Sequence, residues 1–423
     1  MLAFVRMALS AVGYRATARA LEIVGPMLPG GGCSANGGQA WLLRLGLYEL
    51  TRPKPVVDDW LMMIDHTIQT GDGKCLVVVG IRVSDWDHKR RTALEQDPAG
   101  EFALKHEDLS VFAIEHMPSS TAVAVHERLE AISQQSGIVP CGLLCDQGAD
   151  VRGAAHQFAE GHGDTPAVVH DIAHGVANAL KRQLNKNPAW EGFLADANRC
   201  KTAIRQTPYA FLMPPELKNK ARWMNLEPLI DWSRRVRHFL EAPEEALARA
   251  GAPPDLDKLE QKMGWLRRHA ASIQDWAAML EAAAITLKYV RNHGYHDGGH
   301  EALRPLLCEF DKGPAAAMVA ETLQFVQTQC EACGGRRMPG STEVLESLIG
   351  KGKQLMGRNK NGYTKSVLTM ASAVLAITAE TVQIAFQRVK TKDVWRWAEQ
   401  TLGLSLQSQR QRAIPLLNKP QTE

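Results

Sequence analysis

One nearly unbroken apolar run constrains the fold most. It is Gly137-Ile-Val-Pro-Cys-Gly-Leu-Leu-Cys145, and Asp146 follows it directly. A strand with apolar side chains on both faces is typical of a sheet that is covered on both sides by helices. A second apolar run, Trp60-Leu-Met-Met-Ile64, also ends at an aspartate, Asp65. We therefore predict an α/β domain in which both runs form buried strands.

The segment from about residue 58 to 185 alternates between strand and helix patterns. Its predicted strands are 61–67, 75–83, 109–115, 138–145 and 166–169. Thr70-Gly-Asp-Gly73 is typical of a hairpin turn, so the first strands are expected to be antiparallel and the later ones parallel. Helices are expected at 119–133, 150–160 and 172–185, and Ser120 or Thr121 would cap the first of them.

The strand pattern then stops. Residues 187–338 have helical periodicity, and the stretch is too long to be a loop. We predict an all-α insertion, after which a helix at 341–357 returns the chain to the sheet domain. The predicted parts are a helical region with a linker (1–55), the sheet domain (56–186 and 339–404), the insertion (187–338) and a flexible tail (405–423).

The N-terminal region contains two stretches with helical apolar spacing, 13–24 and 39–50. Two short helices with a turn between them are typical of a helix-turn-helix, whose second helix enters the major groove of DNA. A helical cap on the following domain is an alternative of nearly equal weight.

Composition permits a large core but does not define a partner. The chain has 423 residues, of which 45% are hydrophobic and 22% charged, and a net charge of +3, which only mildly favours nucleic acid. No run approaches the ~18 apolar residues of a membrane span, and we interpret the apolar N-terminus as the start of a helix. The eight cysteines fit a reducing cytosol; only Cys330-Glu-Ala-Cys333 has metal-ligand spacing, and this is half of a zinc site.

Three acidic residues carry the predicted chemistry. Asp65 and Asp146 end buried strands, and Glu346 lies on the helix expected at 341–357. Each aspartate is also a good turn former, which is its alternative role. Carboxylate oxygens suit Mg²⁺ or Mn²⁺, and a pair of such ions stabilises both the attacking and the leaving oxygen of a phosphoryl displacement.

Two further choices concern neighbouring acids. Glu343 lies in the first turn of its helix, almost opposite the apolar face, where a carboxylate favours the helix dipole. Glu346 lies near the boundary of the apolar face, so we favour it as the ligand. Asp171 and His174 form an acid–imidazole pair after the fifth strand. Asp171 either orients the site or caps the next helix, and the capping role is favoured.

Basic residues follow the glutamate helix: Lys351, Lys353, Arg358 and Lys360. On most proteins such a run is a solvated surface, but beside a metal site it would contact DNA phosphates. Arg44, in the second predicted N-terminal helix, is a further DNA-contact candidate. The tryptophans of the insertion are expected to lie mostly in its core.

The order and spacing of these motifs resemble those of DDE transposases of bacterial insertion sequences. The resemblance covers residues 58–185 and 338–366. Its carriers are Asp58-Asp-Trp-Leu-Met-Met-Ile-Asp-His-Thr67, Cys75-Leu-Val-Val-Val-Gly-Ile81, Cys145-Asp-Gln-Gly-Ala-Asp150, His170-Asp-Ile-Ala-His174 and Ser341-Thr-Glu-Val-Leu-Glu-Ser-Leu-Ile-Gly350.

This resemblance implies a ribonuclease H-like fold, with a mixed five-stranded sheet, flanking helices and a helical insertion. It also implies that Asp65, Asp146 and Glu346 bind two Mg²⁺ (or Mn²⁺) ions, and that the enzyme cuts transposon ends and joins them to target DNA. Double-stranded DNA, a homodimer or higher oligomer, and a cytoplasmic, nucleoid-associated location are the expected context. Two alternatives are a domesticated or decayed transposase that binds DNA without cutting, and a ribonuclease H-like nuclease without strand transfer.

Overall fold

The computed structural model describes residues 1–10, 13–25, 32–70, 73–163, 165–216, 222–252, 255–356, 364–403 and 406–417. The chain divides into two compact units. Unit 1 consists of Met1–Asp171 and Met338–Glu423, and unit 2 is Ile172–Arg337. The start of unit 2 at residue 172 differs from the predicted start of the insertion at 187, because helix α7 (Ile172–Leu184) belongs to unit 2.

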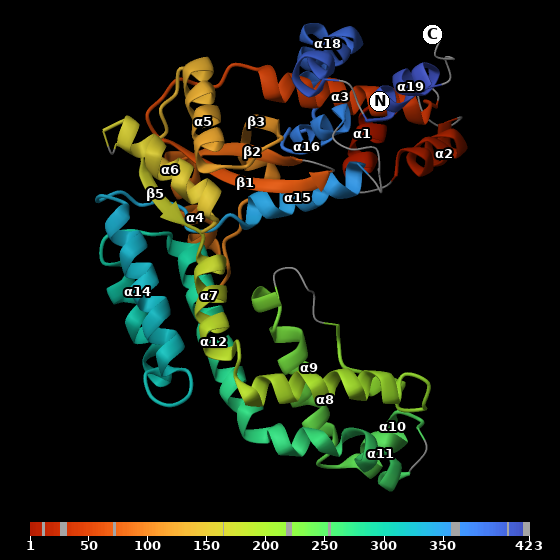
Figure 1. Ribbon diagram of the computed structural model, residues 1–423, viewed down its shortest axis with the longest axis vertical. Helices are drawn as coiled ribbons and strands as arrows, with labels where there is room; N and C mark the ends of the chain where they lie inside the picture. Colours follow the sequence, from red (N-terminus) through yellow and green to blue (C-terminus); the bar gives the residue numbers. More distant parts are fainter. Residues whose placement is uncertain are drawn as a thin grey trace, which may run out of the picture. The chain divides into compact units, whose positions relative to one another are not determined.

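Unit 1 contains a five-stranded mixed sheet in the order β3-β2-β1-β4-β5 (Figure 1). The strands are β1 (Trp60–Thr70), β2 (Gly73–Arg82), β3 (Ser110–Met117), β4 (Gly142–Cys145) and β5 (Ala167–His170). Strand β2 pairs antiparallel with β1 and with β3, whereas β4 pairs parallel with β1 and with β5. The predicted α/β class and mixed five-stranded sheet are confirmed. Strand β4 is shorter than the predicted 138–145, and Pro140, which has no N–H to donate to a ladder, lies just before it.

Unit 1 also contains helices, and the last of them lies in the segment 405–423, which was predicted as a flexible tail. They are α1 (Leu2–Leu9), α2 (Tyr14–Val24), α3 (Ala35–Thr51), α4 (Val83–Gln96), α5 (Ala122–Ser136), α6 (Ala149–Gly161), α15 (Glu343–Met356), α16 (Leu368–Ser372), α17 (Ala379–Arg388), α18 (Thr391–Leu402) and α19 (Leu406–Leu417). Short 3-10 helices lie at His106–Asp108 and Lys365–Val367. The sequence pattern did not predict α4, because that helix is mostly charged and buries only Trp86 and Arg90.

The two faces of the sheet have different covers. Helices α5 and α6 pack on one face, in a core cluster that includes Ile64, Leu143 and Phe158. Gly142 alternates with Leu143 and so faces the other side, where Met338 Sδ lies 2.9 Å from the position that a Cβ would take. Helix α15 follows Met338 in the chain and runs along β1 (Figure 1). Side chains of both faces are therefore buried, as the apolar runs predicted.

Helix α3 is a packing helix of unit 1. None of its residues from Gly37 to Leu50 is exposed. A Cβ on Gly46 would lie 1.8 Å from the carbonyl oxygen of Leu368 in α16, so only glycine permits this approach. A helix that enters a major groove needs an exposed face. The burial of α3 therefore favours the alternative that this region is a helical cap.

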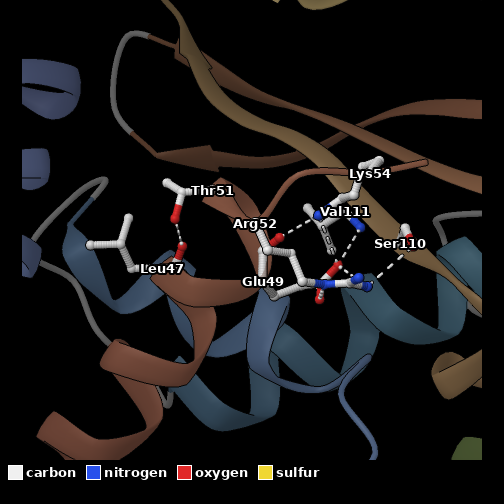
Figure 2. A network of polar contacts seen from close by, with 7 residues as sticks. All are labelled: Leu47, Glu49, Thr51, Arg52, Lys54, Ser110 and Val111. Carbon is white, nitrogen blue, oxygen red and sulfur yellow. Dashed lines mark hydrogen bonds and ion pairs between the residues drawn. The ribbon is translucent and has the colours of Figure 1, made fainter. Parts of the chain in front are cut away.

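Glu49, near the end of α3, fastens that helix to the edge strand β3 (Figure 2). Its side chain is fully buried, and Oε1 accepts hydrogen bonds from the Val111 N–H (3.1 Å) and from Lys54 Nζ (3.2 Å). Arg52 forms an ion pair with the same carboxylate. Burial lowers the pKa of Lys54 to about 8, although the charge of Glu49 acts in the opposite direction. Because an edge strand otherwise offers unpaired N–H groups, this network closes one position of the edge.

Unit 2 is helical. Its helices are α7, α8 (Pro188–Ile204), α9 (Glu227–Phe239), α10 (Pro243–Arg249), α11 (Leu256–Met263), α12 (Ala270–His293), α13 (Gly299–Leu303) and α14 (Ala316–Ala332), with 3-10 helices at Ala210–Leu212, Arg222–Met224, Gly264–His269 and Arg304–Phe310. Aromatic side chains form much of its core: the rings of Trp190 and Trp276 are both buried and lie 4.8 Å apart between centroids. Within the described parts of the whole chain, none of the helices has the length and apolar character that crossing a membrane requires.

Candidate active site

Three aspartates lie at neighbouring positions of the sheet: Asp65, Asp146 and Asp171. Asp146 and Asp171 directly follow β4 and β5, but Asp65 lies within β1, which continues to Thr70, so the prediction that Asp65 ends its strand is wrong. In the parallel ladders, Ile64 pairs with Cys145, and Cys145 pairs with His170. The next residue along each strand is one of the aspartates, so the register brings their backbones side by side. Side chains alternate along a strand, so Asp65 points away from the face that Ile64 shares with α5 and α6.

The charges of these acids act on the buried thiol of Cys145. Burial raises the pKa of this thiol most, and the negative charges of Asp146, Asp171 and Asp65 raise it further. Arg152 acts in the opposite direction. The Cys145 thiol is therefore within electrostatic reach of all three carboxylates and of Arg152.

Helix α15 brings a fourth acid to the same end of the sheet. A carboxylate oxygen of Glu346 lies within 4.8 Å of one of Asp171. Glu346 is half-buried and Asp171 is fully buried. Glu343, the alternative glutamate, is the first residue of the helix, and its N–H donates to Ser341 Oγ (3.3 Å). Of these two glutamates, the structure places Glu346 beside Asp171. Within the described residues, Asp65 and Asp146 belong to no group of three possible ligands at this distance, so the predicted set of Asp65, Asp146 and Glu346 is not brought together as closely.

Backbone contacts fix the positions of two of these acids. Asp146 Oδ1 accepts a hydrogen bond from the Gly148 N–H at 3.0 Å. This is the turn that was the alternative role of Asp146, and it uses one of the two carboxylate oxygens. Asp171 Oδ1 accepts a hydrogen bond from the Thr342 N–H at 2.7 Å. Thr342 is the residue just before α15. His174 lies in the first turn of α7 and is half-buried.

A polar network that the sequence did not predict lies at this end of the sheet, on the face opposite to the side chain of Asp65. His66 alternates with Asp65, and its Nδ1 lies 3.4 Å from Asp150 Oδ2. Asp150 also accepts hydrogen bonds from Lys74 (2.9 Å) and from Ser120. Burial opposes ionisation of Asp150, but these two hydrogen bonds outweigh it and lower its pKa to about 2. Burial lowers the pKa of His66.

This network ties β1, β2 and the segment before α5 to the first turn of α6. It thereby holds the loop that carries Asp146. Ser120 was predicted as an alternative helix cap, but the capping oxygen is that of Thr121, which accepts from the Ala124 N–H at 3.2 Å.

The basic candidates have different environments. On α15, Lys353 is exposed and Lys351 is half-buried. Arg44 donates to the carbonyl oxygens of Val389 (2.8 Å) and Phe386 (3.0 Å), and its guanidinium lies over the Phe386 ring. These contacts favour a packing role for Arg44. Two other predicted DNA contacts lie outside the described residues: Arg358 and Lys360.

Cys330 and Cys333 are buried in unit 2. Within the described residues, neither belongs to a group of three His, Cys, Asp or Glu side chains at metal-ligand distance. Cys333 Sγ donates to the carbonyl oxygen of Tyr295 (3.8 Å). The described structure therefore gives these cysteines a packing environment.

Comparison with models of known protein families gave no match, and comparison with curated proteins gave none either. A function for this chain is therefore inferred from its residues and their geometry.

Proposed function

We propose that this protein is a DDE transposase, which cuts DNA at the ends of an insertion sequence and joins those ends to target DNA. The observation that carries the proposal is that four acidic residues lie at one end of the sheet. Asp65, within β1, and Asp146, directly after β4, come one residue after a pair of the parallel ladder, and a carboxylate oxygen of Glu346 lies within 4.8 Å of one of Asp171. The strand order, with a helical unit between β5 and α15, is what a ribonuclease H-like domain with an insertion requires.

The donor set fits the metal that this chemistry needs. Asp65, Asp146 and Glu346 would hold two Mg²⁺ or Mn²⁺ ions, because these cations prefer hard carboxylate oxygens. Carboxylates gathered at one place repel one another, and a cation between them removes that repulsion. When bound, the ions would make a water molecule nucleophilic and stabilise charge on the attacking and leaving oxygens.

Other groups of the chain would position the acidic residues and bind DNA phosphates. The β ladder holds Asp65, and the Gly148 N–H orients Asp146. Lys353 lies two helical turns after Glu346 on α15, so it and Lys351 would contact the DNA backbone near the cut. Arg358 and Lys360 would extend this basic track. The proposed partners are two DNA ends and a target duplex, bound by a homodimer or larger assembly in the cytoplasm.

Two other functions make different predictions. A decayed transposase would bind DNA without cutting, but all three acids are retained here, which favours a working site. A ribonuclease H-like nuclease would cut DNA without joining it to a target. A strand-transfer assay with unlabelled target DNA separates this second case from a transposase.

The test is cleavage of labelled DNA that carries the element's own ends, with Mg²⁺. We expect nicking at the ends by the wild type, and a loss on the order of 1000-fold in Asp146→Ala, since the metals supply several kcal/mol. Glu95→Gln, which removes an exposed carboxylate of α4, is the matched control and should cut normally. Specific binding without any cleavage by the wild type would refute the enzymatic proposal.

A further inference from the structure

We infer that Asp171 is a positioning residue, which fixes Glu346 relative to Asp146 through a continuous chain of hydrogen bonds. This role rests on the proposed function, in which Asp146 and Glu346 bind the same metal ions. Asp146 and Glu346 are 200 positions apart in the sequence, and all of unit 2 lies between them. A direct structural link is needed to hold both at ligand distance from the same ions.

The link consists of three hydrogen bonds. The Asp171 N–H donates to the carbonyl oxygen of Cys145 (3.0 Å), the residue just before Asp146. Asp171 Oδ1 accepts from the Thr342 N–H (2.7 Å). The carbonyl oxygen of Thr342 then accepts from the Glu346 N–H (3.0 Å). Asp171 therefore joins the end of β4 to the first turn of α15.

The hydrogen bond between Asp171 and Thr342 is buried, which favours the arrangement in which it is formed. Asp171 is 0% exposed and Thr342 is 3% exposed, so water cannot replace the bond between them. A buried polar group that loses its partner costs free energy, and a bond to a charged acceptor is stronger than a neutral one. The carboxylate also faces the N-terminus of the 14-residue helix α15, where the helix dipole favours negative charge. Helix α15 is thus held where Glu346 meets the strand ends.

Asp171 as a metal ligand is the competing assignment, because its carboxylate lies within 4.8 Å of that of Glu346. The two roles differ in what they require of the side chain. A positioning residue needs the Oδ1 acceptor, and asparagine retains this acceptor, although its hydrogen bond is weaker than that of a carboxylate. A metal ligand needs the negative charge, which asparagine lacks.

The experiment measures Mn²⁺ affinity by electron paramagnetic resonance of the free ion, for the full-length wild type, Asp171→Ala, Asp171→Asn and Asp171→Leu. Thermal unfolding checks that each variant is folded, and leucine fills the buried space if alanine destabilises the protein too far. We expect alanine and leucine to weaken Mn²⁺ binding about 10- to 100-fold, as is typical for groups that orient ligands. Asparagine should stay within about threefold of the wild type, and Glu95→Gln should match it.

The outcomes are distinct. If asparagine weakens Mn²⁺ binding as much as alanine does, the charge is required and the positioning role is overturned. If alanine and leucine bind Mn²⁺ like the wild type, the hydrogen bond does not position Glu346 and the proposal is also overturned. If the wild type itself binds no Mn²⁺, the metal-dependent function fails and the positioning role fails with it.

Discussion

The two edges of the sheet each have a fully buried carboxylate, but in opposite electrostatic settings. At the β3 edge, Glu49 is surrounded by the cations Arg52 and Lys54. At the β5 edge, Asp171 lies within 4.8 Å of a second carboxylate, Glu346. Opposite charges around a buried acid are what a structural lock needs. Like charges gathered at one end of a sheet cost stability, and such an arrangement is typical of a site that binds a cation.

The largest expected effect is at the β3 edge. Glu49→Ala leaves Arg52 and Lys54 beside an empty space and the Val111 N–H without its acceptor. We expect it to lower the free energy of unfolding by about 3–5 kcal/mol, the usual cost of breaking a buried ion pair. Urea unfolding measures this, with Glu95→Gln as the control. A loss below about 1 kcal/mol would mean that Glu49 does not lock the edge.

The acidic end of the sheet, where Asp146 and Asp171 follow β4 and β5, should respond to metal instead. A ligand that binds only the folded state adds about 2.7 kcal/mol of stability at a concentration 100 times its Kd. Mg²⁺ should therefore raise the unfolding temperature of the wild type but not that of Asp146→Asn. Glu49→Ala, if folded, should keep the metal-induced increase. An equal increase in Asp146→Asn would place the metal elsewhere.

The acidic residues and the other polar contacts of unit 1 differ in how far the sequence predicts them. The neighbouring positions of Asp65 and Asp146 were predictable, because each follows an apolar run and both runs form strands of one sheet, but the end of β1 was not, since it continues past Asp65 to Thr70. The Glu49–Val111 and His66–Asp150 contacts were not, because they join segments far apart in the sequence and no local pattern marks them. Among helices, amphipathic α15 was predicted and the mostly charged α4 was not.

A smaller effect is expected for the basic residues of α15. Lys351→Ala and Lys353→Ala together should weaken DNA binding on the order of tenfold and lower the slope of log K against log salt by about 2. Unfolding of the metal-free protein should be nearly unchanged, since Lys353 is exposed. Lys392→Ala, which removes an exposed lysine of α18, is the control. An unchanged salt slope would exclude phosphate contacts by these lysines.

The pH dependence of the β3 edge follows from Lys54. Burial lowers its pKa to about 8, whereas an unfolded lysine has a pKa of about 10.4. Between these values the unfolded state binds more protons, so the contribution of Lys54 to stability increases with pH. Relative to Lys54→Met, the wild type should gain on the order of 1 kcal/mol between pH 7.5 and 9.5. A decrease instead would mean that Glu49 raises the pKa of Lys54 more than burial lowers it.

The smallest effect is the most specific test of the comparison, because the same chemical change should have opposite signs at Glu49 and at Asp146, which follows the inner strand β4. Glu49→Gln removes a charge that two cations need, and should destabilise the protein. Asp146→Asn keeps the acceptor for the Gly148 N–H but removes one of the like charges near Cys145.

Without metal, Asp146→Asn should therefore stabilise the fold, by about 0.5–1 kcal/mol at low salt. Chemical unfolding in a chelator measures the effect, and added salt should reduce it, because salt screens the repulsion. Destabilisation by Asp146→Asn would instead make Asp146 a structural acid like Glu49. A gain in stability that accompanies a loss of metal binding would mean that this end of the sheet is strained by its own charges until a cation binds.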